Sequence, residues 1–429
     1  MRIHILNFKS QAALAALLLA TTANAQTTDS SVTLKYAYKD HFIIGAAINR
    51  TIATGTSGRG NRTQEQIDGD VAIVVKHFNQ VSPENDLKWQ LIHPTAGPDG
   101  YNWEPADAFV EYGVKHKMYL VGHTLVWHGQ TPNWVFQGTA PAATEATTPT
   151  AAAETKQQEG DAANRGAGEG DAARRGRGRR GGGRRGITGP LATRDELLQR
   201  MRDHIHAVVG RYKGKIKSWD VVNEALADGD GEEVLRSSYW TRIIGDDFIA
   251  KAFQFAHEAD PDCILRYNDY GLENANKRRK LVTLIKQLKE QGVPVHAIGT
   301  QAHLNVSTAS FERMDEALTE MATLGLPIHV TELDINSAQG GQRNTGADIA
   351  QNAAATEGGL VSDADKRLAD AYEATFRAFV KHKANVKVVT FWGANDAVSW
   401  RASGRPLLFD GNNQAKPAFD AVIRVANEK

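Results

Sequence analysis

Two glutamates of this chain each follow a strongly apolar run. Glu224 lies near the end of the stretch SWDVVNEA (218–225), and Glu332 lies within HVTELDI (329–335). Either acid alone could be structural, capping a helix or pairing with an arginine. Two carboxyl groups about 5–5.5 Å apart, however, can cleave a glycosidic bond with retention, one as nucleophile and the other as acid/base. The pair is therefore the first candidate for chemistry.

The two acids have different neighbours in the sequence. An acid/base must stay protonated until it donates to the leaving oxygen, whereas a nucleophile must stay ionised. Glu332 has Asp334 nearby and could reach His303, while Glu224 lies beside Asn223 in an apolar run. The surroundings of the two acids therefore differ, as two distinct roles would require.

Four tryptophans lie on or just after the ends of strand-like segments, namely Trp89, Trp127, Trp392 and Trp400. A bulky apolar ring at such a place needs a reason for exposure. Sugar rings present apolar C–H faces, and an indole gives them a rigid stacking surface. Beside paired acids and amide side chains, the four rings indicate a polysaccharide cleft.

The segments that must position these residues alternate between strand-like and helix-like. Several of the strand-like ones are near-continuous apolar runs, which is typical of strands covered on both faces in a parallel sheet. The strand candidates are 42–48, 80–85, 118–128, 216–224, 264–270, 297–304, 327–335 and 386–393.

Amphipathic stretches such as 193–212, 246–259 and 276–292 lie between the strands. The first begins with Thr193 three residues before Glu196, which is a capping-box pattern, and the last ends at Gly292. Eight strands that are each followed by a helix predict an α/β fold, a (β/α)₈ barrel with enlarged loops. The alternative is an open doubly wound sheet, which is weakened because no G-x-G-x-x-G follows the first strand.

Polar side chains gather at one end of these strands. In a (β/α)₈ barrel the carboxyl ends of the strands form the face that carries the active site. A common placement there favours a site over solvated strand tips. The residues at or near those ends are Glu84, Asn85, His123, Asn223, Glu224, Asn268, Asp269, Gln301, His303, Glu332 and Trp392.

The N-terminal segment has the pattern of a secretory signal peptide. Arg2 and Lys9 precede a short apolar run, and Ala23-x-Ala25 offers a cleavage site. A membrane anchor would need about 20 apolar residues, and this run is shorter. We therefore expect a signal peptide over 1–25, a catalytic domain over 26–429, and a secreted or periplasmic protein.

Residues 139–189 break the alternation of strands and helices. This segment has few large apolar residues and no period, so it predicts a disordered low-complexity insertion after the third strand, rich in Ala and Thr and then in Arg and Gly. A tolerated surface loop is the simplest interpretation. The Arg/Gly tract over 174–186 could also attract acidic substituents of a polymer; nucleic-acid binding would conflict with export.

The net charge and the cysteine content exclude some classes of binding partner and of crosslink. The formal net charge is zero and the pI is about 7.3, so no global field recruits nucleic acid or anionic membranes. Cys263 is the single cysteine, which excludes an internal disulfide. We expect a monomer with no cofactor whose partner is a polysaccharide.

Two other functional classes are alternatives. A metal-dependent hydrolase is disfavoured because His123 and His128 are five residues apart, an offset that sends strand side chains to opposite faces, and because H-E-x-x-H is absent. A non-catalytic carbohydrate-binding protein would need the cleft but not two matched acids. We therefore expect no metal site.

The sequence resembles glycoside hydrolase family 10, the endo-β-1,4-xylanases, along nearly all of the expected mature chain. The resemblance implies β-1,4-xylan as substrate, although a β-1,4-glucan on the same fold remains an alternative. The matching motifs are GAAIN (45–49), SPENDLKW (82–89), GHTLVWH (122–128), WDVVNEA (219–225), YNDY (267–270), QAHL (301–304), VTELDI (330–335), FWG (391–393) and PLLFD (406–410).

Carried over by position, the resemblance implies that Glu224 is the acid/base and Glu332 the nucleophile. It implies that Asn223 binds the 2-hydroxyl of the sugar at the scissile bond and that His303 links Glu332 to Asp334. Asp220 and Asp334 would be supporting residues. The residues implied to line the subsites on the non-reducing side are Glu84, Asn85, Lys88, His123, Trp127, Gln301, Trp392 and Trp400.

The chain departs from the family pattern at a few places. Asn395 stands where Thr is common, and Gly271 stands where Asn is frequent. The insertion over 139–189 and the long connection after the seventh strand are further departures. None of them touches a catalytic match, so they bear on subsite preference and not on the type of reaction.

Overall fold

Parallel strands close into a barrel in the part of the chain that the structure describes. The computed structural model describes residues 32–57, 62–138, 187, 189–338 and 362–428. The strands follow the order β6-β5-β4-β3-β2-β1-β9-β8, and β6 also pairs with β8, so this sheet of eight has no free edge. The barrel strands are β1 (Ile43–Ile48), β2 (Gln80–Pro83), β3 (Tyr119–Trp127), β4 (Ile216–Asn223), β5 (Ile264–Asp269), β6 (Ala297–Thr300), β8 (Ile328–Asn336) and β9 (Val386–Phe391).

The eight-stranded ring confirms the predicted (β/α)₈ barrel, and the doubly wound alternative is wrong. Every pairing in the ring is parallel. Most strand residues are buried, as expected for strands with side chains in the barrel on one face and helices on the other.

One predicted strand is interrupted. The segment 297–304 forms β6 and then a separate β7 (His303–Asn305), which pairs only with the far end of β8. The break falls at Gln301 and Ala302, and Ala302 has a φ of +56°. A left-handed residue cannot continue a strand, so the chain turns there and starts again.

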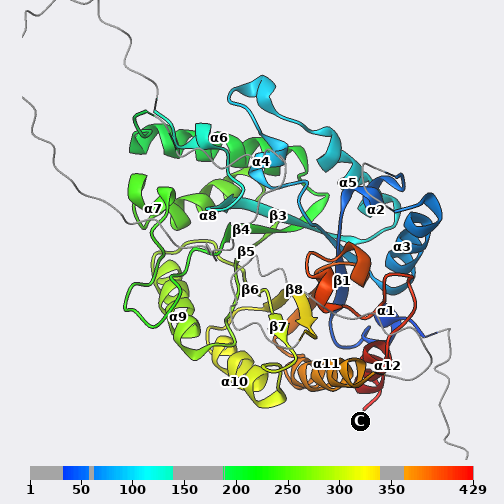
Figure 1. Ribbon diagram of the computed structural model, residues 1–429. Coiled ribbons are helices and arrows are strands. Elements are labelled where there is room, and N and C mark those ends of the chain that lie inside the picture. The colour runs from blue at the N-terminus through cyan, green and yellow to red at the C-terminus, as the bar shows by residue number, and fades with distance from the viewer. Residues whose placement is uncertain (1–31, 58–61, 139–186, 188, 339–361, 429) are drawn as a thin grey trace, which may run out of the picture.

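A ring of helices surrounds the strands, one after each barrel strand (Figure 1). The ring helices are α3 (Gln64–His77), α5 (Glu104–Lys115), α6 (Arg194–Arg211), α8 (Phe248–Ala259), α9 (Ala275–Glu290), α10 (Phe311–Ala322), α11 (Asp363–Lys381) and α12 (Pro417–Ala426). Shorter helices lie in the connections: α1 (Leu34–Ala37), α2 (Arg50–Thr54), α4 (Trp89–Ile92), α7 (Tyr239–Ile243), and the 3₁₀ turns η1 (Pro98–Gly100), η2 (Asn133–Val135), η3 (Asp396–Val398) and η4 (Ala402–Gly404).

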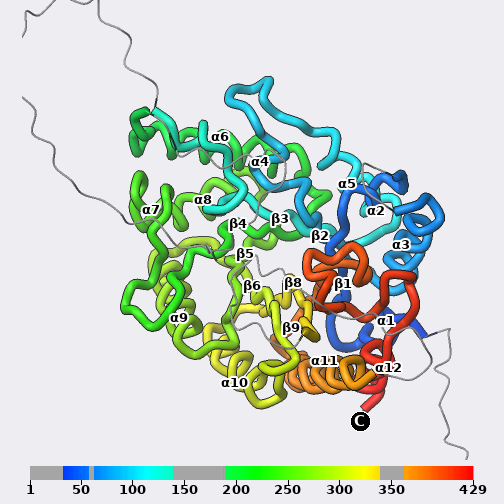
Figure 2. Tube along the Cα trace, viewed as in Figure 1, coloured from blue at the N-terminus to red at the C-terminus, as the bar shows by residue number. Residues whose placement is uncertain are grey.

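The predicted start of α6 is confirmed. The Thr193 hydroxyl accepts a hydrogen bond from the Glu196 amide at 3.3 Å, and the Glu196 carboxylate accepts one from the Thr193 amide at 2.7 Å. At the other end of the fold, α1 and α12 lie side by side (Figure 2), and the Tyr38 hydroxyl donates to the Val422 carbonyl at 2.6 Å. No helix in the described ranges has the length and apolar character needed to cross a bilayer.

Large side chains fill the barrel where small ones make room. Gly122 of β3 lies under the ring of Trp219 of β4, and a Cβ on Gly122 would be 2.1 Å from a ring carbon of Trp219. Deeper polar groups are paired: Arg266 of β5 forms a buried ion pair with Asp220 of β4. This pair lies beneath the polar residues at the carboxyl ends of the strands.

Some predicted segments lie outside the described residues. These are the signal peptide (1–25), residues 139–186 and 188 of the insertion, and residues 339–361 of the connection after β8. The described residues that flank the insertion are joined: the Gly138 amide donates to the Pro190 carbonyl at 2.8 Å, and Gln137 forms an antiparallel bridge with Leu191.

Candidate active site

The two glutamates lie at the same end of the barrel and are joined through amide side chains. Gln301 Nε2 donates to Glu224 Oε1 at 3.0 Å and to Asn223 Oδ1 at 3.3 Å. Asn268 Nδ2 donates to the same Asn223 oxygen at 2.9 Å and to Glu332 Oε1 at 2.8 Å. One continuous set of hydrogen bonds therefore runs from one carboxylate to the other.

Glu332, on β8, has surroundings that favour its ionised form. His303 Nε2 lies 3.2 Å from Glu332 Oε2, and His123 Nδ1 lies 4.0 Å from Oε1. Burial would raise the pKa of Glu332, but the hydrogen bond from His303 and the charges of His123 and His303 lower it below its usual value. The surroundings of Glu332 therefore favour the ionised form, which suits a base or a nucleophile.

His303 lies between two acids. Its Nδ1 is 3.1 Å from Asp334 Oδ2, on the side away from Glu332. Burial would lower the pKa of His303, yet the charges and hydrogen bonds of Asp334 and Glu332 raise it to about 9. The imidazole is thus cationic at neutral pH. Asp334 is itself held by Trp400 Nε1 at 2.8 Å and by Arg401 Nη1 at 3.0 Å.

Glu224 has the opposite electrostatic surroundings. Burial raises its pKa above the usual value, the hydrogen bonds from Gln301 and Trp127 oppose that change, and the negative charges of Asp269 and Glu332 add to it. Trp127 Nε1 donates to Glu224 Oε2 at 2.9 Å. A carboxyl group in these surroundings is suited to hold a proton and release it.

Asn223, the residue before Glu224, has a fixed side-chain amide. Its oxygen accepts the two hydrogen bonds from Gln301 and Asn268 described above, so the direction of the amide is set. Within the described ranges, no group accepts a hydrogen bond from Asn223 Nδ2. That nitrogen is left as a donor for a hydroxyl beside both acids.

His123 connects the site to the inside of the barrel. His123 Nδ1 lies 2.9 Å from Asp220 Oδ2, and that oxygen also accepts from Arg266 Nη2 at 3.0 Å. Burial would raise the pKa of Asp220, but the charge and hydrogen bonds of Arg266 and His123 lower it to about 2. Asp220 therefore stays ionised and orients His123 beside Glu332.

The residues after β2 approach the same end of the barrel. Lys88 Nζ donates to Asn85 Oδ1 at 3.0 Å and lies 5.3 Å from the centre of the Trp127 ring. Burial lowers the pKa of Lys88, while the charges of Glu332, Glu84 and Glu224 raise it. Burial also raises the pKa of Glu84. Lys88 therefore interacts electrostatically with both Glu224 and Glu332.

The tryptophans divide into two kinds. Trp400 is 38% exposed, and its ring centre lies 5.0 Å from that of His303. Trp392 is largely buried and lies edge-on to His123 at 5.2 Å. The expectation that Trp89 contributes to an exposed sugar platform is wrong: it is buried, and its ring stacks on buried His204 at 3.7 Å. Helix α4 turns this ring into the core.

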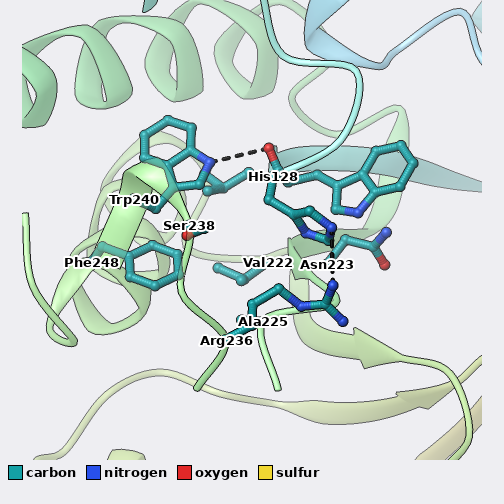
Figure 3. Close-up of a pocket in the computed structure, with 10 residues that line it drawn as sticks. His128, Val222, Asn223, Ala225, Arg236, Ser238, Trp240 and Phe248 are labelled. Carbon is teal, nitrogen blue, oxygen red and sulfur yellow. Dashed lines mark hydrogen bonds between the residues drawn. The ribbon is translucent and has the colours of Figure 1, made fainter. Parts of the chain in front are cut away.

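A small pocket is lined by Asn223, Trp127, His128, Arg236 and Trp240, among others (Figure 3). Trp240 Nε1 donates to the Trp127 carbonyl at 3.1 Å, and Arg236 Nη1 donates to His128 Nε2 at 3.1 Å. His128 thus contacts Arg236, whereas His123 contacts Asp220. Because β3 is irregular between His123 and Val126 and ends at Trp127, the alternation of a regular strand does not apply to this pair. No group of three His, Cys, Asp or Glu side chains in the described ranges could hold a metal ion.

Several residues of the site had no role assigned from the sequence. Asn268 was noted only as a polar strand end, yet it contacts Asn223 and Glu332, and Thr331 Oγ1 fixes its amide by donating to Asn268 Oδ1 at 2.7 Å. Arg266 was also missed. A charged residue within the apolar run ILRYND (264–269) was the available signal, because a buried charge needs a partner.

Comparison with known proteins agrees with this geometry. The sequence model described as glycosyl hydrolase family 10 matches residues 33–156 and 187–425. A β-1,4-xylanase from Dictyoglomus thermophilum is 35% identical over 398 residues, which cover 91% of this chain and 90% of the relative. The chain belongs to glycosyl hydrolase family 10.

Solved structures of family 10 members have the same fold. A GH10 endoxylanase from a sugarcane soil metagenome superposes with a TM-score of 0.71 at 34% identity, over 92% of this chain and 99% of that one. An intracellular xylanase of Thermoanaerobacterium saccharolyticum, a mutant in complex with xylotetraose, gives a TM-score of 0.68 at 33% identity, over 91% and 98%. The family 10 match leaves out residues 157–186, which fall within the predicted insertion.

Proposed function

We propose that this glycoside hydrolase is a retaining endo-β-1,4-xylanase in which Glu332 is the nucleophile and Glu224 the acid/base. The observation that carries the proposal is the opposite direction of the two pKa shifts within one hydrogen-bonded set. The surroundings of Glu224 favour its protonated form and those of Glu332 favour its ionised form, which is the division that double displacement needs.

In the first step, Glu332 attacks the anomeric carbon while Glu224 gives its proton to the departing glycosidic oxygen. The C–O bond to the leaving sugar breaks, and an ester bond forms between Glu332 and the retained sugar. In the second step Glu224, now ionised, takes a proton from water as that water attacks the anomeric carbon. The ester is cleaved, and both carboxyl groups return to their starting states.

The neighbouring residues would hold the sugar chain. Asn223 Nδ2 is the donor for the 2-hydroxyl beside the scissile bond, an interaction that strengthens as charge develops there. His123, His303 and Gln301 fix the two acids. The residues proposed to bind sugars on the non-reducing side are Glu84, Asn85, Lys88, Trp127, Trp392 and Trp400.

The choice of xylan rests on similarity. The relative described above is named a β-1,4-xylanase, and the T. saccharolyticum structure contains xylotetraose. Xylose lacks the hydroxymethyl group of glucose, so discrimination against β-1,4-glucan would be steric. We further propose that the protein is exported by the segment 1–25 and acts as a monomer.

The test is product analysis on glucuronoxylan, arabinoxylan and soluble cellulose. We expect xylo-oligosaccharides from both xylans, little from cellulose, and a loss of roughly 10⁴-fold or more in Glu332→Ala. NMR of the first products should show the β-anomer. Greater release from cellulose would favour the glucan-active alternative, and binding to xylan without any reducing sugar would favour a non-catalytic protein.

A further inference from the structure

The backbone is left-handed at Glu224. This residue has a φ of +57°, a conformation that residues other than glycine rarely adopt. The Glu224 amide donates to the Asn268 carbonyl at 2.9 Å. The conformation must be maintained by contacts around it, because the chain would otherwise relax to a commoner one.

Two fully buried side chains of β5 supply those contacts. The Tyr267 hydroxyl accepts hydrogen bonds from the amides of Ala225 and Leu226, both at 3.0 Å. The same hydroxyl donates to Asp269 Oδ2 at 2.6 Å, and that oxygen also accepts from the Leu226 amide at 3.2 Å. A tyrosine hydroxyl has one proton and two lone pairs, so all three positions are used.

Asp269 is itself fixed on its other side. Its Oδ1 accepts from the Tyr270 amide at 2.9 Å and lies 2.9 Å from Lys277 Nζ of α9. Both Tyr267 and Asp269 have no exposed surface. The two residues after Glu224 are therefore bonded to groups that cannot move without disturbing β5 and α9.

We propose that Tyr267 and Asp269 are positioning residues that hold Glu224 in its left-handed turn and so aim its carboxyl group at the leaving oxygen. The proposal rests on the role of Glu224 as acid/base given above. Neither residue touches the substrate in this account. Each acts through the backbone of residues 225 and 226, and Asp269 acts in addition through its charge.

The charge of Asp269, like its hydrogen bonds, supports the role of Glu224 as an acid. The charged groups around Glu224 are Asp269 of β5, Glu332 of β8 and Lys88 after β2. Asp269 and Glu332 both raise the pKa of Glu224 and so favour its protonated form. Removing the charge of Asp269 should therefore let Glu224 lose its proton at a lower pH.

The main test compares Tyr267→Phe with Tyr38→Phe on two substrates. Tyr38 is a matched control because it is equally buried and donates one hydrogen bond to a carbonyl far from the site. Xylan has a poor leaving group that needs a proton, whereas 2,4-dinitrophenyl β-xylobioside has a good one that does not. We expect kcat/KM of Tyr267→Phe to fall about 10- to 100-fold on xylan and less than about twofold on the dinitrophenyl glycoside.

A purely structural role would lower kcat/KM equally on both substrates. That result, or an unchanged kcat/KM on xylan, overturns the proposal. Glu224→Gln is measured alongside: if it keeps full activity on xylan, the assigned role of Glu224 has failed, and the positioning role falls with it. If Glu224→Gln loses activity on xylan while Tyr267→Phe retains full activity, the positioning role alone is refuted.

Asp269→Asn tests the same proposal if the phenylalanine variant does not fold. Asparagine keeps an acceptor for the Leu226 amide but removes the charge. We expect the alkaline limb of the pH profile of kcat/KM on xylan to move to lower pH, together with a larger loss on xylan than on the dinitrophenyl glycoside. An unchanged alkaline limb and an unchanged ratio between the substrates would overturn it.

Discussion

At the scale of the residue, neighbours decide how each of the two glutamates behaves. Glu332 is as buried as many core residues, yet cationic His303 keeps its pKa low, and that cation is maintained by Asp334. Among the residues that the structure describes, Trp127 and Gln301 donate hydrogen bonds to Glu224 and no cation does, and the pKa of Glu224 is raised. Two residues of the same type, Glu224 and Glu332, are thus suited to different chemistry because their neighbours differ.

Replacing His303 should shift one side of the pH profile. Because the hydrogen bond and charge of His303 lower the pKa of Glu332, His303→Gln should raise that pKa. Less of Glu332 is then ionised at a given acidic pH, so the acidic limb of kcat/KM on xylan should move to higher pH. His206→Gln on the outside of α6 is the control, and an acidic limb that stays in place would contradict the assignment.

At the scale of the element, the barrel strands were largely predictable because buried parallel strands read as apolar runs. The capping residues of α6 were predictable for a similar reason, since they depend on local sequence. The break between β6 and β7 was not, because nothing in QAHL (301–304) marks Ala302 as left-handed. The backbone of the preceding Gln301 is bonded to Asp269 and Glu332, and the Ala302 carbonyl accepts from the Asp334 amide. These partners are distant in sequence.

The close approach of β3 and β4 gives a stability prediction. Gly122→Ala would place a methyl group against the Trp219 ring and should destabilise the fold by about 1–3 kcal/mol. Gly210→Ala is the matched control: it lies in α6 with open space around it, and should be neutral or stabilise by up to about 1 kcal/mol. Urea unfolding of both variants measures the difference, and equal stabilities would show that the barrel adjusts freely.

At the scale of the whole molecule, the barrel and the meeting of Glu224 and Glu332 at one end of it could be anticipated, whereas the supporting contacts could not. Asn268, Arg266 and Thr331 act through partners on other strands, and sequence separation hides such partners. The expectation that the Trp89 ring is exposed was wrong because its position after β2 resembles that of exposed site residues. Only the packing of α4 against His204 reveals that it belongs to the core.

The joined flanks of the insertion give a prediction for the whole chain. Because Gly138 and Pro190 are already hydrogen-bonded, deleting 141–188 should leave the barrel closed, with a Tm changed by no more than about 3 °C. Activity on neutral arabinoxylan should match that of the full chain. A loss confined to glucuronoxylan would mean that the basic tract attracts acidic substituents, and a loss on both polymers would contradict a tolerated loop.

The interruption between β6 and β7 has one more consequence. The Gln301 side chain donates a hydrogen bond to Glu224, and the Gln301 carbonyl accepts one from the backbone amide of Glu332. A displacement of this short segment would therefore disturb hydrogen bonds to both acids at once. The position of one acid is thereby linked to that of the other through a single residue of the chain.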